Sequence, residues 1–71
     1  MKEQILKALR MKYQGAVEEA KANIEIYLTN SAGIGEHPEI LQAIDTQMEL
    51  IAEAEDKIVV LDSHFTAPRI P

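Results

Sequence analysis

The chain has 71 residues, a formal net charge of −5 and no cysteine. This length predicts one small domain, and the lack of cysteine excludes disulfides and thiolate metal sites. The acidic balance disfavours nonspecific binding to nucleic acid, and no apolar run approaches the roughly 18 residues of a membrane span. The charge-studded N-terminus has no apolar segment typical of a secretory signal, so we expect a cytoplasmic protein that does not enter the membrane.

Residues 3–29 carry apolar side chains at helical spacing, which predicts one long helix. On a helical wheel these side chains fall within an arc of roughly 140°, typical of an amphipathic helix. This first stripe consists of Ile5, Leu6, Leu9, Tyr13, Ala16, Val17, Ala20, Ile24, Tyr27 and Leu28. Its two tyrosines fit a core better than a ligand site. Gly15 is either tolerated or permits a close helix crossing, and the nearby alanines favour the crossing.

Residues 30–37 predict a tight turn because glycine and proline cluster there. Gly33 and Gly35 can adopt the positive φ that closes a turn, and Ile34 is expected to plug the end of the helix pair. Pro38 suits the first turn of a second helix. A Gly-x-Gly pair also occurs in phosphate-binding loops, but the preceding strand and the Gly-Lys-Ser/Thr motif are both missing here.

Residues 38–64 predict the second helix, followed by a flexible tail over residues 66–71. The second stripe consists of Ile40, Ile44, Met48, Ile51, Ala54, Ile58, Leu61 and Phe65. Leu41 and Val59 widen it on one flank and Leu50 on the other, so the apolar arc approaches roughly 180°. One neighbouring helix cannot cover such an arc.

The predicted architecture is therefore all-α, a two-helix antiparallel hairpin over residues 1–65. The wide second stripe favours assembly of two hairpins into a four-helix bundle dimer. Leu41, Leu50 and Val59 are the expected interface residues.

Charge is distributed unevenly along the chain. The first 12 residues have a balance of +3 and the remaining 59 a balance of −8. A hairpin would place the basic start beside the acidic C-terminal half of the second helix, where Glu53, Glu55, Asp56 and Asp62 lie, which predicts complementarity along the hairpin or between subunits. A basic arm for nucleic acid is the alternative.

No catalytic, cofactor-binding or metal-binding residues are expected. Asp62, Ser63 and His64 are adjacent on a helix and point about 100° apart, so they cannot converge on one atom. His37 would lie at the opposite end of the hairpin from His64, roughly 40 Å away at 1.5 Å per residue. An enzyme is therefore the least favoured class.

Residues 33–40, followed by residues 52–57, resemble small uncharacterised proteins of marine T4-like bacteriophages. The resemblance covers roughly residues 18–65, is specific at the turn and is loose in the helices. It implies a phage accessory protein in the host cytoplasm and assigns no residue a role.

The favoured function is a non-catalytic structural or interaction module that binds a protein partner. Glu49, Glu53 and Asp56 form an acidic row at helical spacing and are the candidate partner-binding residues. The alternative is a role related to nucleic acid, either DNA binding through the basic first turns or mimicry of DNA by the acidic helices.

Overall fold

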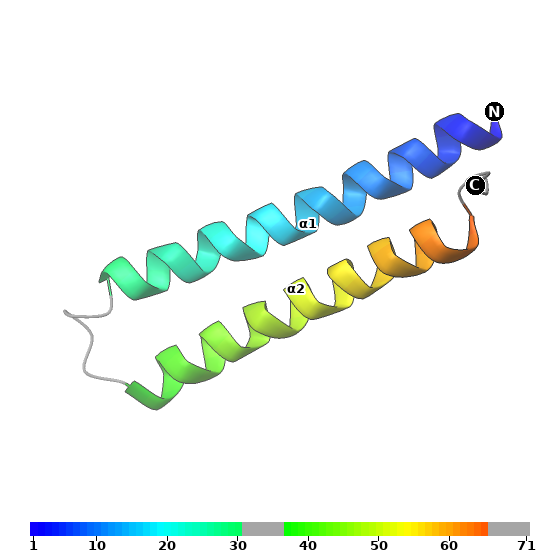
Figure 1. Ribbon diagram of the computed structural model, residues 1–71. Helices are drawn as coiled ribbons and strands as arrows, with labels where there is room; N and C mark the ends of the chain where they lie inside the picture. The colour runs from blue at the N-terminus through cyan, green and yellow to red at the C-terminus, as the bar shows by residue number, and fades with distance from the viewer. Residues whose placement is uncertain (31–36, 66–71) are drawn as a thin grey trace.

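The computed structural model describes residues 1–30 and 37–65, with side chains for residues 1–29 and 39–65. α1 spans Lys2–Asn30 and α2 spans His37–His64. The helices run antiparallel, with the start of α1 and the end of α2 at the same end of the molecule (Figure 1). The predicted all-α hairpin is confirmed, and the helix bounds differ from the predicted ones by one residue at three of the four ends.

Residues 31–36 of the predicted turn, which include Gly33, Ile34 and Gly35, and the tail over residues 66–71 lie outside the described residues, whereas positions 30 and 37 belong to the helices. Pro38 is the second residue of α2. There its fixed φ suits the helix and its missing N–H is not needed. Glu39 places negative charge in the first turn, near the positive end of the helix dipole.

Two polar contacts fix the register of the helices. At the open end, the Arg10 guanidinium donates hydrogen bonds to both carboxylate oxygens of Asp62. Closer to the connector, the Asn23 side-chain amide donates to the Gln47 side-chain carbonyl at 3.1 Å. The number of residues between the two contacts is nearly the same on α1 as on α2, so α2 runs back along α1 without a large offset.

The core is a narrow seam. Among the described apolar residues only Ala20, Ala54 and Leu61 are buried, with 2%, 5% and 4% of their surface exposed. Most other stripe residues are half-buried. The more exposed stripe members are Ile5, Leu28, Met48 and Phe65. Two helices meet along a line, so apolar arcs as wide as those of the two stripes leave their flanks in water.

The hairpin is elongated, with principal extents of 54 × 19 × 17 Å and a radius of gyration of 16.4 Å. A compact domain of this length has a radius of gyration of about 11 Å. The chain exposes 5904 Å² of surface. A compact monomer of the same mass exposes about 4,400 Å². The single hairpin thus leaves far more surface in water than a compact domain would.

The close crossing expected at Gly15 is wrong for the contact between α1 and α2. A Cβ added at Gly15 would meet nothing within 4 Å. Gly15 is five residues before Ala20, which turns it about 140° away from that buried position at 100° per residue. The alanines at positions 20 and 54 occupy the seam instead.

Gly15→Ala is expected to stabilise the hairpin by about 0.5–1 kcal/mol, because alanine costs less backbone entropy in a helix and space is available. Chemical denaturation of the two proteins measures this. Ala22→Gly, at another exposed position of α1, is the mirror control and should destabilise by a similar amount. Destabilisation by Gly15→Ala would show that another molecule approaches this position closely.

Candidate interaction surfaces

The hairpin has two sides, and each is marked by a contact between the helices. Asp62, paired with Arg10, marks one side, which we call the Asp62 side. Lys57, whose ammonium lies 5.6 Å from the Tyr13 ring centroid, marks the other, the Lys57 side. Lys57 and Asp62 are five residues apart on α2, and therefore about 140° apart around its axis.

Seven-residue steps, close to two helical turns, assign the remaining residues of α2 to these sides. Stepping back from Asp62 leads to Glu55, Met48 and Leu41, and Val59 lies one turn before Asp62. Stepping back from Lys57 leads to Leu50. The predicted interface residues Leu41 and Val59 thus share the Asp62 side, whereas Leu50 lies on the Lys57 side.

The polar contact on the Asp62 side confirms the charge complementarity predicted along the hairpin. The Arg10 and Asp62 side chains are 32% and 51% exposed. The hydrogen bond to Asp62, helped by Coulombic attraction, raises the pKa of Arg10, which therefore remains charged at any ordinary pH. Exposed ion pairs stabilise a fold weakly, so this contact mainly fixes register at the open end.

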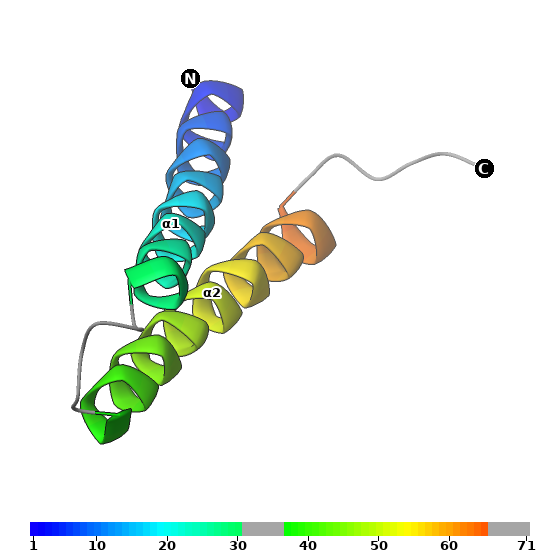
Figure 2. The ribbon, with the colours of Figure 1, turned by 90° about the vertical axis from the view of Figure 1, so that its left-hand side faces the viewer.

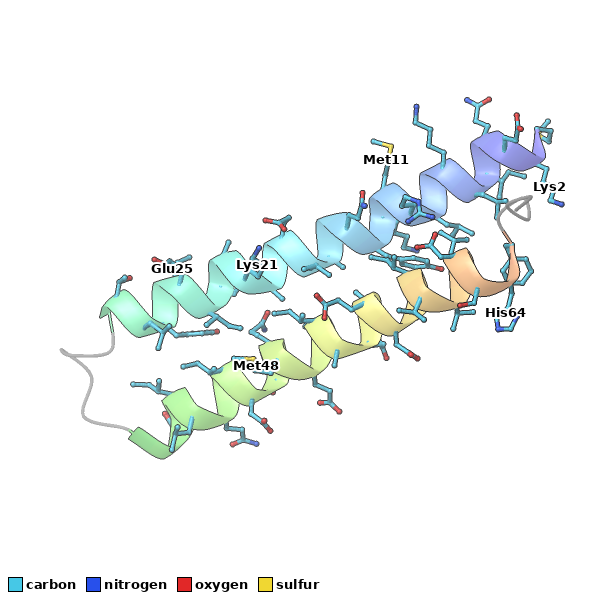
Figure 3. The ribbon with its side chains drawn as sticks, viewed as in Figure 1. Lys2, Met11, Lys21, Glu25, Met48 and His64 are labelled. Carbon is cyan, nitrogen blue, oxygen red and sulfur yellow. The ribbon has the colours of Figure 1, made fainter. Side chains whose placement is uncertain are left out.

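The apolar residues on the Asp62 side are largely in water. Leu41 is 70% exposed, Val59 59% and Met48 52%. Together they extend along most of α2, outside its contact with α1. Figure 3 labels Met48, and it also shows Met11 on α1 pointing away from α2.

A cation links the two helices on the Lys57 side. Besides its position over Tyr13, the Lys57 ammonium lies 3.9 Å from a Glu53 carboxylate oxygen. Tyr13 and Tyr27 are both half-buried, in keeping with the core role expected of them. Lys21 and Glu18 form a local ion pair on α1, at 3.3 Å.

A groove lies between the helices at the open end. Figure 2 shows the two helix axes diverging toward the start of α1. The groove has a volume of about 240 Å³ and is lined by Leu6, Leu9, Tyr13, Lys57, Val60, Leu61 and Phe65. Apart from the Lys57 ammonium and the Tyr13 hydroxyl, the lining side chains are hydrocarbon. Because Lys57 and Val60 belong to its wall, the groove borders the Lys57 side.

The acidic row lies next to the same side. Glu49, Glu53 and Asp56 are all exposed. Glu53 is four residues before Lys57, and Glu49 and Asp56 are seven residues apart, so the three carboxylates follow one strip of α2. Val60, four residues after Asp56 and seven after Glu53, lies within this strip, and Leu50 lies about 60° from Glu53 around the axis, toward Lys57. The structure therefore combines an apolar flank and an acidic strip on the Lys57 side.

The histidines and carboxylates are the side chains that could form a catalytic or metal-binding site. Asp62 is engaged by Arg10, whereas the His64 ring lies edge-on to Phe65 with 6.3 Å between centroids, so the two do not form a relay. Among residues 1–30 and 37–65, no cluster of three or more histidine, aspartate or glutamate side chains could hold a metal ion. Neither described helix is long and apolar enough to cross a membrane.

Sequence reasoning missed four exposed apolar residues outside the two stripes: Met1, Met11, Ile26 and Val60. A signal for Val60 was present in the run Ile58 to Leu61, because four consecutive apolar residues must point in every direction around a helix. Comparison with known proteins adds no assignment: no family model, curated protein or solved structure matches the chain. Function is therefore inferred from these two sides.

Charge exchange tests the contact that fixes the open end. Arg10→Asp and Asp62→Arg should each lower the melting temperature, since each places like charges together, and the double variant should recover most of the loss. Thermal melts followed by circular dichroism measure this. Arg10→Asp combined with Glu55→Arg is the control and should show no recovery. Equal recovery in both combinations would mean that only net charge matters.

Proposed function

We propose that this chain is a non-catalytic interaction protein that forms a homodimer and binds a protein partner through its helical surfaces. The observation that carries the proposal is the apolar surface of α2 that α1 leaves in water, above all Leu41 and Val59. Exposed apolar patches on small proteins usually mark interaction surfaces. The resemblance to small phage proteins supports an accessory role in the cytoplasm of an infected host.

The exposed area supports a second copy as the cover for this surface. Each separate chain exposes 5904 Å². A compact particle of twice the mass exposes about 7,300 Å², so joining two chains in such a particle would bury about 4,500 Å². That area is typical of permanent homodimers, which bury about 2,000–5,000 Å². The proposed assembly is the four-helix bundle in which each hairpin supplies two helices.

Charge supports the Asp62 side as the contact between copies. A two-fold axis brings the same patch of both subunits together, so a row of like charges near the axis would repel itself. The Asp62 side carries Glu55 and Asp62 with one cation, Arg10, whereas the Lys57 side carries the three carboxylates of the acidic row with one cation on the same helix, Lys57. We therefore assign Leu41, Met48 and Val59 to the dimer contact and leave Leu50 outside it.

The alternative function in nucleic-acid binding has weaker support. Arg10 belongs to the basic first turns, and its guanidinium is already engaged by Asp62. Mimicry of DNA would use the exposed acidic row, yet the same row suits a protein partner with basic residues. No described contact favours the nucleic-acid role over the protein partner.

Light scattering and thermal melts test the dimer. At tens of micromolar the wild type should scatter as twice 7.9 kDa, and its melting temperature should rise with protein concentration. Leu41→Lys with Val59→Lys should give a monomer with a lower melting temperature, because lysine ammonium groups resist burial at the contact. Leu50→Lys is the matched control and should remain dimeric. A monomeric wild type whose melt does not depend on concentration would contradict the dimer.

A further inference from the structure

We propose that the Lys57 side is the docking site for a basic amphipathic helix of the partner protein. This inference rests on the proposed function, because it takes the Asp62 side as the contact between subunits. It adds the place where the partner binds and the chemistry that the partner must have. Three features of the Lys57 side lead to it: an apolar flank, a groove and an acidic strip.

The apolar flank offers a helix a surface along the hairpin. Leu50 and Val60 are 44% and 43% exposed. They are ten residues apart, about 15 Å along α2 and about 80° around its axis, so a docked helix of about three turns would contact both by crossing α2 at an angle. Ile5 extends the flank onto α1: it is five residues before Arg10 and so turns about 140° away from the Asp62 side. Apolar side chains one turn apart on the partner would cover these positions.

The groove provides an anchor point. Its volume of about 240 Å³ exceeds the roughly 150 Å³ of an apolar cavity that binds benzene. It can therefore receive one large apolar side chain, a leucine or a phenylalanine. Because the groove borders Val60 at the end where the helices diverge, a helix lying along Leu50 and Val60 would reach it (Figure 2).

The acidic strip determines the charge of the occupant. Glu49, Glu53 and Asp56 border the apolar flank with exposed carboxylates, which outnumber the two cations of this side, Lys57 and Lys12. Lysines or arginines beside the apolar positions of a docked helix would lie opposite these carboxylates, whereas an acidic helix would be repelled. A second copy docking here through a two-fold axis would oppose the two strips. Charge complementarity therefore favours a basic helix from another protein.

A pair of synthetic peptides tests the site by fluorescence anisotropy. Both are labelled 18-residue helices with leucines repeated at i, i+3, i+4 and i+7; one carries lysines at the other positions and the other carries glutamates. The wild type should bind the lysine peptide at least tenfold more tightly than the glutamate peptide. Its affinity should fall as salt rises from 50 to 300 mM, since salt screens exposed charges. Equal affinity for both peptides would overturn the proposal.

Two variants separate the Lys57 side from other exposed apolar residues. Leu50→Ser with Val60→Ser should weaken binding of the lysine peptide at least tenfold, whereas Met11→Ser, at an exposed residue of α1 that points away from α2, should leave it within about threefold. Helical content is checked by circular dichroism, and single-leucine variants replace any double variant that unfolds. Equal losses from the two variants would overturn docking on the Lys57 side.

Reversal of the acidic strip separates specific docking from general attraction. Glu49→Lys with Glu53→Lys and Asp56→Lys should exchange the preference, so that the glutamate peptide binds more tightly. If reversal of the acidic strip changed the affinity but Leu50→Ser with Val60→Ser did not, the binding would be nonspecific electrostatic attraction. That result would overturn the site.

Light scattering on the same samples distinguishes failure of the dimer from failure of the docking site. A monomeric wild type that binds the lysine peptide through Leu50 and Val60 would refute the dimer and retain the site. Particles larger than a dimer that Leu50→Ser with Val60→Ser reduces to dimers would show a second copy on the Lys57 side. That result would overturn the assignment to a basic partner helix.

Discussion

The narrow contact between two helices is the constraint on which the rest of this structure depends. A pair of helices buries side chains along one line, and here that line fully covers only Ala20, Ala54 and Leu61 among the described apolar residues. Burial of one large aliphatic side chain contributes about 1.5–3 kcal/mol, whereas ordering one backbone residue costs about 1–2 kcal/mol. These three buried side chains alone offset little of that ordering, so most of the apolar burial in the hairpin is partial. The flanks of both stripes are the apolar surface that remains in water.

Polar contacts across the seam set the register of the two helices. The alanines and half-buried aliphatic side chains of the seam cannot set it, because they would tolerate a shift of one helix along the other. Arg10 with Asp62 and Asn23 with Gln47 penalise such a shift at two separate points. Lys57 over Tyr13 adds a third contact on the opposite side. Each is weak in water, yet a shift would break all of them together. Register is thus set by specific pairs and stability by apolar burial.

The helices and their pairing could be predicted from the sequence because both follow from short-range patterns. Apolar spacing gives the helices, the cluster of glycine and proline separates them, and charge asymmetry anticipates the pairing of Arg10 with Asp62. The groove could not be predicted, since it depends on the angle between two helix axes and periodicity carries no information about that angle. The expectation of a close crossing at Gly15 was wrong because it relied on the alanines near Gly15 in the sequence. The direction of Gly15 around the helix relative to Ala20 already points it away from the other helix.

The two sides of the hairpin differ in charge, and this difference gives each a separate role. If both sides were equally apolar and neutral, each hairpin could bind a copy on either face, and association would continue into an open chain. The acidic strip beside Leu50 and Val60 opposes this outcome, because a second copy there would bring like charges together in a partly apolar contact. In the proposed function, the same carboxylates would attract a helix of opposite charge, so one row of residues on α2 would both limit self-association and select a partner.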